Sequence, residues 1–330
     1  MRGVKQYIRV VCLALATLVV SAGCIKENLD GCERCIAFEY FADGEVDLFA
    51  EHVERVHLYV FDQNDIMVPA SKLGGGCNPI VLEKSDLEEY HGAKLLITGG
   101  TYRFVAVANI DTHEATEVYN LASGAMSEVY CSHPDCTTTE VEGNDPLLLG
   151  AKVVEIPDDT DFATKIRLYS ARQKAKVTVK GYIGDEVQGI ETKASSGDLA
   201  LRLKNVSSKL DFYTDDPTAT DQNLASGDLV TYSPVLTLDR ETGYYEAEFY
   251  ILRHTAESTL VFEIVEQATD RVLCSVSLQE FLREFYEVDI TKQEVEIPLI
   301  IEFTDEVIVT IPSWMLEHRY PIYDKTNLDR

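Results

Sequence analysis

Short segments in which apolar and polar residues alternate recur along most of this chain. In residues 174–180, for example, Ala175, Val177 and Val179 share one face of an extended strand, whereas lysines occupy the other face. One face of that strand is therefore expected to be buried and the other to contact water. Similar β-branched and aromatic runs, separated by clusters of Gly, Asn, Asp and Pro, occupy residues 35–42, 54–62, 93–110, 199–213, 243–253, 258–267, 271–278, 294–303 and 306–311.

Helical patterns are few. Residues 85–92, 114–122 and 278–287 are the segments that we expect to be helical. Many short strands at intervals of roughly 8 to 12 residues, with few helices, indicate an all-β protein built of β-sandwiches. A polar stretch without apolar periodicity, residues 184–198, predicts the boundary between an N-terminal domain at 36–190 and a C-terminal domain at 191–330.

The N-terminus has the order of a secretory signal. Arg2, Lys5 and Arg9 make a positive start, and residues 10–20 are largely apolar. This apolar run is too short for a membrane-spanning helix, which needs roughly 20 residues. The segment is therefore expected to direct export of the protein.

A cysteine follows the small residues 21–23 at the end of this segment. The arrangement resembles the lipobox of bacterial lipoproteins, in which that cysteine is acylated and becomes the mature N-terminus, although Ser21 stands where leucine is usual. We predict a lipoprotein signal peptide at residues 1–23, lipid attachment at Cys24 and a tether at residues 24–35. The simpler alternative is a secretory signal that leaves Cys24 free.

Charge restricts the partners. Removal of the predicted signal takes away three positive charges and no acid, so the formal charge changes from −27 to −30. Such a chain is repelled by nucleic acid and by anionic lipid, which excludes nucleic acid as a partner and leaves acyl chains as its membrane attachment. Lys26 and Glu27 resemble the lysine-plus-acid tag of surface-exported lipoproteins, although Asn28 interrupts it. We therefore expect a surface-facing protein.

Six cysteines remain besides Cys12 and Cys24, and they allow fifteen pairings. Cys131 and Cys136 are the most local pair that could form a disulfide. A zinc site made of Cys32, Cys35, Cys131 and Cys136 is the alternative, but the two pairs lie about 100 residues apart in an exported protein, where disulfides persist.

The sequence contains no constellation typical of an enzyme. A nucleophile elbow, an HExxH motif and a phosphate-binding loop are all absent. Asp158, Asp159 and Asp161 could bind calcium, but a turn glycine and a distal glutamate in register are missing, so a solvated turn is favoured. We predict no catalytic residue, cofactor or metal.

Several segments in their order resemble the fimbrium anchor subunits of type V pili. The segments that carry the resemblance are CIKENLDGC at 24–32, IAFEYF at 36–41, VERVHLYVFD at 53–62, GTYRFVAVAN at 100–109, LLLGAKVVEI at 147–156, KAKVTVKGY at 174–182, FYILRHTAESTLVFEI at 249–264 and VIVTIPSWMLEHRYPIY at 307–323. The resemblance implies two transthyretin-like (Greek-key) β-sandwich domains in tandem. It also implies that the protein holds a fimbrium at the outer membrane through its lipid, in fimbrial assembly and cell adhesion, with stalk or accessory subunits as partners.

The resemblance includes stalk and tip subunits as well as anchors. Stalk subunits are implied to lose an N-terminal strand by cleavage after an arginine, and Arg34 and Arg55 are the arginines between Cys24 and Arg103. An anchor must keep both the lipid and this strand. The predicted lipid attachment at Cys24 therefore favours the anchor role. Because an open sheet edge can be completed by a strand of a neighbour, residues 294–303 and 306–311 are candidates for strand complementation, with ordinary inner strands as the alternative.

The main alternative from another class is a surface glycan-binding lipoprotein. Shallow sugar sites rely on exposed aromatic platforms. The chain has one tryptophan, Trp314, within the family-like stretch, and 17 tyrosines. A panel of polysaccharides would test this alternative.

Overall fold

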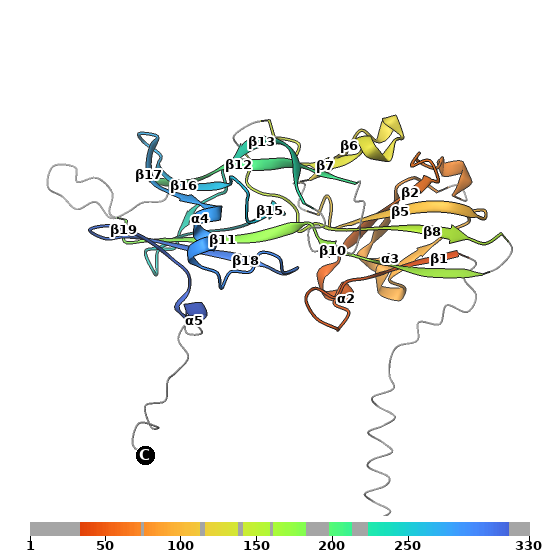
Figure 1. Cartoon of the computed structure of the whole chain (residues 1–330), viewed down its shortest axis with the longest axis horizontal. Coiled ribbons are helices and arrows are strands. Elements are labelled where there is room, and N and C mark those ends of the chain that lie inside the picture. Colours follow the sequence, from red (N-terminus) through yellow and green to blue (C-terminus); the bar gives the residue numbers. More distant parts are fainter. Residues whose placement is uncertain are drawn as a thin grey trace, which may run out of the picture.

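The computed structural model of the protein describes residues 34–73, 76–112, 116–137, 141–158, 161–182, 198–212 and 224–316. These residues form four β-sheets and a few short helices, arranged as two sandwiches that follow one another along the long axis of the molecule (Figure 1). The prediction of an all-β protein with two β-sandwich domains is confirmed.

The first sandwich consists of a three-stranded sheet, here called sheet I, and a five-stranded sheet, sheet II. Sheet I has the order β4-β1-β9, and sheet II has the order β10-β8-β5-β2-β3. The strands are β1 (Arg34–Glu39), β2 (Arg55–Asp62), β3 (Ile80–Glu83), β4 (Gly92–Lys94), β5 (Gly100–Ala108), β8 (Leu148–Ile156), β9 (Phe162–Arg167) and β10 (Tyr169–Ser170).

The core of the first sandwich follows the alternation of β2. Leu58 and Val60 point into the same buried cluster as Ile36 and Phe38 of β1, and all four are at most 1% exposed. Burying a side chain of this size contributes about 1.5–3 kcal/mol relative to leaving it in water. The hydrophobic effect therefore joins sheet I to sheet II.

The second sandwich consists of sheet III, with the order β14-β15-β11-β18-β19, and sheet IV, with the order β17-β16-β12-β7-β6, where β13 also pairs with β12. The strands are β6 (Glu117–Tyr119), β7 (Tyr130–Ser132), β11 (Arg172–Lys180), β12 (Leu199–Asp211), β13 (Ser226–Tyr232), β14 (Thr237–Leu238), β15 (Tyr245–Leu252), β16 (Val261–Glu266), β17 (Arg271–Ser277), β18 (Glu296–Phe303) and β19 (Val307–Thr310).

Strand β11 bears out the alternation read from the sequence. Ala175, Val177 and Val179 are fully buried in the core of the second sandwich, and the lysines on the other face are partly exposed. The strand pairs antiparallel with β15 and parallel with β18. In the sequence, β11 precedes the predicted domain boundary between residues 190 and 191, whereas its partners β15 and β18 follow that boundary. The boundary itself stays a prediction, because residues 183–197 lie outside the described part of the chain.

The hairpin of β6 and β7 crosses between the sandwiches. It lies between β5 and β8 in the sequence, yet β7 pairs with β12 of sheet IV, with Leu210 opposite Cys131. A third buried cluster fills the junction, where Tyr59 and Phe61 on the outer face of sheet II join Cys131 and Phe212. The two sandwiches are therefore joined by a hairpin that leaves the first sandwich and pairs within the second, and by an apolar cluster to which both contribute.

The helices are short. They are α2 (Phe49–His52), α3 (Lys84–Glu89), α4 (Leu278–Glu284) and α5 (Ser313–Leu316), with the 3-10 turns η1 (Ala70–Lys72), η2 (Leu121–Ser123) and η3 (Met126–Glu128). The N-terminus of α3 has a capping box of Glu83 and Asp86, and Ser277 caps α4 by accepting a hydrogen bond from the N–H of Glu280. No helix among the described residues has the length and apolar character needed to cross a bilayer.

Helices are confirmed within residues 85–92 and 278–287, and the prediction for 114–122 was wrong. Residues 117–119 form strand β6 and residues 121–123 form the turn η2. Pairing of β6 with β7, from Glu117 opposite Ser132 to Tyr119 opposite Tyr130, provides hydrogen bonds that local helix propensity could not anticipate.

Candidate functional site

Strand β1 connects the predicted tether to the fold. It pairs parallel with β9 along its whole length, from Arg34 opposite Phe162 to Glu39 opposite Arg167, and antiparallel with β4. Arg34 Nη2 also donates hydrogen bonds to the carbonyl oxygens of Pro157 and Asp158, at 3.0 and 2.8 Å. The strand is therefore the middle of sheet I and is anchored at its first residue. Cys24 itself lies outside the described residues.

A polar cluster connects the first sandwich to the segment that leads into β18. The Glu294 carboxylate accepts hydrogen bonds from the Tyr40 hydroxyl and from the guanidinium of Arg172, with 3.2 Å between Arg172 Nη2 and Glu294 Oε2. Burial and the adjacent carboxylate raise the pKa of Tyr40 above its ordinary value, so this hydroxyl remains a donor. Asp43 accepts hydrogen bonds from the N–H groups of Gln293 and Glu294 at 2.9 and 3.2 Å.

Arg253 lies at the centre of the same junction and is 2% exposed. Its guanidinium donates hydrogen bonds to the carbonyl oxygens of Ser170, Ile290 and Lys292, at 3.0, 2.9 and 2.6 Å. Burial lowers the pKa of this arginine from its ordinary value, yet an arginine remains charged in a protein. One buried cation therefore fixes the end of β10 against the loop before β18.

His254 is buried beside Arg253. Its backbone N–H donates to Gln173 Oε1 at 3.1 Å, and its Nδ1 lies 3.1 Å from Ser258 Oγ. Its Nε2 has no hydrogen-bond partner among the described residues. Burial lowers the pKa of His254 to about 4, because the charged imidazolium would have to be desolvated.

We expect the stability of the protein to decrease in mild acid through His254. The unfolded chain takes up this proton near pH 6.5, whereas the folded protein resists protonation down to about pH 4. The contribution is therefore complete above pH 6.5, and about 3 kcal/mol is lost as the pH falls through this window. Urea unfolding of the wild type and of His254→Gln between pH 7 and pH 4 measures it, and parallel pH curves for the two proteins would contradict the assignment.

The edge of sheet III is formed by β19. This strand pairs with β18, from Ile300 opposite Thr310 to Phe303 opposite Val307, and has no second partner strand among the described residues. Ile308 of β19 is 47% exposed, and Trp314 of the following α5 is 64% exposed. An unpaired edge next to exposed apolar side chains is a typical binding surface for an additional strand.

Strand β18, the other candidate for complementation, lies inside its own sheet between β11 and β19. Ile297, Leu299 and Ile301 are buried, so the alternative of an ordinary inner strand is correct for β18. Pro298 pairs opposite Lys176 of β11, in the part of β18 that β19 does not reach. A residue that lacks an N–H donor is accommodated there without loss of a hydrogen bond to β19.

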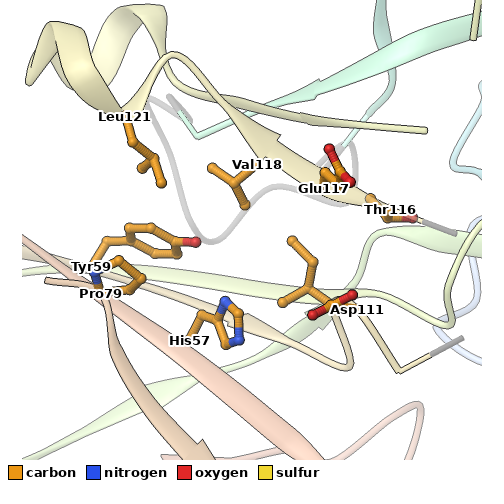
Figure 2. A pocket seen from close by; sticks show the side chains of 9 residues that line it. His57, Tyr59, Pro79, Asp111, Thr116, Glu117, Val118 and Leu121 are labelled. Atoms are coloured by element: carbon orange, nitrogen blue, oxygen red, sulfur yellow. The ribbon is translucent and has the colours of Figure 1, made fainter. Parts of the chain in front are cut away.

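A cavity of about 310 Å³ lies between the outer face of sheet II and β6 (Figure 2). It is lined by His57 and Tyr59 of β2, by Val118 and Glu117 of β6, and by Pro79, Ile110, Asp111, Thr116 and Leu121. Tyr59 is 1% exposed, and its hydroxyl points into the cavity (Figure 2). Burial, and then the nearby Arg55, lower the pKa of His57, so its ring is neutral at pH 7.

Residue pattern alone did not indicate this cavity. The alternation of RVHLYVFD places His57 and Tyr59 on the same face of β2, which was the available signal. The opposing wall comes from β6, the segment that was wrongly predicted as a helix.

Cys131 and Cys136 are free thiols in the structure. Cys131 is buried in the junction between the sandwiches, and burial raises the pKa of its thiol, which makes it unreactive. A bridge between the two stays a prediction. Among the residues that the structure describes, no three His, Cys, Asp or Glu side chains are grouped to hold a metal ion. The alternative zinc site includes Cys32 and the alternative calcium site includes Asp159, and both of these residues lie outside the described part of the chain.

Comparison with known proteins identifies a family. The model of the family described as fimbrillin-A associated anchor proteins Mfa1 and Mfa2 matches residues 29–320. None of the curated proteins matches the chain significantly.

Solved structures share the fold. A candidate polysaccharide-binding protein from Bacteroides thetaiotaomicron has a TM-score of 0.64 and 14% identity, over 86% of this chain and 96% of that one. A candidate adhesin from the same organism has a TM-score of 0.62 and 16% identity, over 87% and 98%. The fimbrial anchor protein Mfa2 from Porphyromonas gingivalis has a TM-score of 0.58 and 16% identity, over 84% and 96%. At such identities the likeness shows the fold alone.

Proposed function

Because this chain belongs to the family of fimbrillin-A associated anchor proteins Mfa1 and Mfa2, we propose that it is an outer-membrane lipoprotein that holds a fimbrium at the cell surface. Cys24 is its lipid attachment site, and fimbrial stalk or accessory subunits are its partners. The role is structural rather than enzymatic, and it serves assembly of the fimbrium and adhesion of the cell.

The position of β1 is the observation that carries this proposal. Nine residues separate Cys24 from Arg34, so the lipid lies at most about 35 Å along the chain from the first residue of β1. Six residue pairs then hold β1 against β9, and its apolar side chains fill the first core. A pulling force on the fimbrium would therefore reach the lipid through a strand that is paired on both sides.

The rival role within the family is that of a polymerising stalk subunit. Cleavage after Arg55 would remove both Cys24 and β1 and would leave β4 and β9 without the strand between them. Arg55 is the first residue of β2, where its Nε lies 3.0 Å from Glu83 Oε2 and its Nη1 lies 3.4 Å from Asp111 Oδ2. These ion pairs hold the bond after Arg55 within a folded sheet, which disfavours proteolysis there.

Intact-mass and N-terminal analysis of the protein from its native membrane tests the proposal. An acylated Cys24 with residues 25–55 retained is the expected result. A mature chain that begins at Val56 would overturn the anchor role in favour of a polymerising subunit.

The proposal also assigns a docking site for the neighbouring subunit, which is the edge of β19. An extended segment of that subunit adds to β19 through main-chain hydrogen bonds, and exposed apolar side chains such as Ile308 and Trp314 pack against it. The buried interior of sheet III supports the strand from behind, because β18 and β11 are packed into the second core.

Substitution Ile308→Lys is expected to weaken attachment of the partner subunit by about tenfold or more, because an edge lysine opposes strand addition and an apolar contact of about 1.5–3 kcal/mol is lost. Val272→Lys is the matched control, since Val272 lies on β17 at the edge of sheet IV and is 44% exposed, against 47% for Ile308. Fimbriae retained per cell are counted for each variant. Equal losses for the two variants would argue against β19 as the docking edge.

A further inference from the structure

We propose that the junction between the two sandwiches is a joint that bends in one direction, by opening a polar clasp. The clasp consists of Tyr40 and Asp43 of the first sandwich, which hold residues 293–294 of the second sandwich through hydrogen bonds. The joint is a property of the free protein, so this inference does not depend on the fimbrial role.

A direct connection of the chain between the sandwiches is the point about which the joint turns. Strand β10 of sheet II ends at Ser170, and β11 of sheet III begins at Arg172. Arg253 holds this connection to the second sandwich. Its backbone N–H donates to the carbonyl oxygen of Ala171, and its guanidinium donates to that of Ser170, both at 3.0 Å. The connection therefore stays in place when the contacts on one side of it open.

The clasp closes one side of this connection. The Glu294 carboxylate accepts a hydrogen bond from the Tyr40 hydroxyl, and Asp43 accepts hydrogen bonds from the N–H groups of residues 293 and 294 at 2.9 and 3.2 Å. Arg172, at 3.2 Å from Glu294, holds that carboxylate on the second sandwich. Asp43 is exposed and the Glu294 side chain is 33% exposed, so water can replace these bonds when the clasp opens.

The other side of the connection is apolar. Ala171 belongs to the same buried cluster as Phe212, whereas its neighbour Arg172 belongs to the polar side. Because successive side chains of an extended chain point in opposite directions, the cluster and the clasp lie on opposite sides of the connection. Figure 1 agrees, since β7 lies above β10, and α2, whose His52 is 3.6 Å from Glu294, lies below it.

Two features keep the apolar side closed. Opening it would expose buried apolar surface to water, which the hydrophobic effect opposes. The β6–β7 hairpin also spans this side, because β7 pairs with β12 of the second sandwich while the loop of the hairpin is bonded to the first. The N–H of Met67 donates to the carbonyl oxygen of Gly124 at 2.7 Å, and that of Met126 donates to the carbonyl oxygen of Asp65 at 2.9 Å. The polar side is therefore the one that opens.

Pulsed electron paramagnetic resonance on the full-length protein in detergent tests the proposal. Spin labels are attached to keto amino acids rather than to cysteines, because Cys77 is an exposed free thiol. One label pair replaces Glu51 of α2 and Asp305 of the turn after β18, and it reports on the clasp side. The other pair replaces Asn64, after β2, and Ala268, before β17, and it reports on the apolar side. All four positions are exposed, so the labels leave the cores intact.

The double variant Tyr40→Phe/Asp43→Ala is expected to show a second, longer distance between the labels at 51 and 305. This open state should be at least about tenfold more populated than in the wild type, because hydrogen bonds to two carboxylates are lost. The distance between the labels at 64 and 268 should keep its single value. Tyr102→Phe is the matched control, since its hydroxyl lies 3.3 Å from Thr98 Oγ1 within the first sandwich, and it should resemble the wild type.

A single unchanged distance between positions 51 and 305 in the double variant would overturn the proposal. Equal broadening of the distances for both label pairs would also overturn it, because that result indicates a general loosening of the fold. If the double variant does not fold, Tyr40→Phe alone, which keeps the buried ring, gives the same comparison.

Discussion

We expect the Cys24→Ser variant to be lost from the outer membrane and recovered in soluble fractions, with its fimbriae shed from the cells. Each buried methylene of an acyl chain contributes about 0.8 kcal/mol to membrane binding, and two or three chains hold firmly where one is marginal. Electrostatic attraction does not compensate, because a formal charge of −30 is repelled by anionic lipid. Fractionation followed by immunoblotting measures the effect.

Cys32→Ser is the control for this experiment, since Cys32 lies in the same tether but outside the lipobox-like position. This variant is expected to stay in the membrane fraction. Retention of Cys24→Ser after a high-salt and carbonate wash would refute the lipid site, because such a wash removes proteins held only by charge.

The second large effect is expected for Arg253→Met, which should lower the free energy of unfolding by about 3–5 kcal/mol. The substitution keeps much of the side-chain volume but leaves the carbonyl oxygens of Ser170, Ile290 and Lys292 buried without their donor. It also removes the cation that lies near Glu294 and Asp43. Urea unfolding followed by fluorescence or circular dichroism gives the value.

Arg240→Met, in an exposed turn, is the matched control and should change the free energy of unfolding by no more than about 0.5 kcal/mol. If Arg253→Met is too unstable to purify, Arg253→Lys serves instead, since it keeps the charge and loses only the planar fork of donors. A loss below about 1 kcal/mol for both Arg253 variants would mean that the junction does not depend on this residue.

Alternation along the chain predicted most strands and their buried faces. In β11, the period of two separated Ala175, Val177 and Val179 from the lysines, and the structure buries the same three side chains. Helices were also predicted correctly within residues 85–92 and 278–287, where α3 (Lys84–Glu89) and α4 (Leu278–Glu284) lie. The period of apolar residues predicts which side chains are buried. The prediction holds for these elements because the rest of the protein covers only one face of each.

The candidate sites could not be predicted from the period of apolar residues. His57 and Tyr59 could be placed on one face of β2, but nothing local indicated that Glu117 and Val118 would form the opposite wall. The partners of Arg253 lie 37 to 83 residues away along the chain, so its role as the centre of a junction could not be seen in the sequence.

The sequence by itself determined the β-rich architecture, the acidic character of the protein and the family resemblance, since each follows from residue type and order. Only the tertiary structure decided that β6 is a strand, that the β6–β7 hairpin pairs with β12, and that β11 lies between β15 and β18. The physical reason is that a strand leaves its main-chain hydrogen bonds unmade until a partner is found. That partner is selected by packing and chain connection across the whole molecule, and not by the residues of the strand alone.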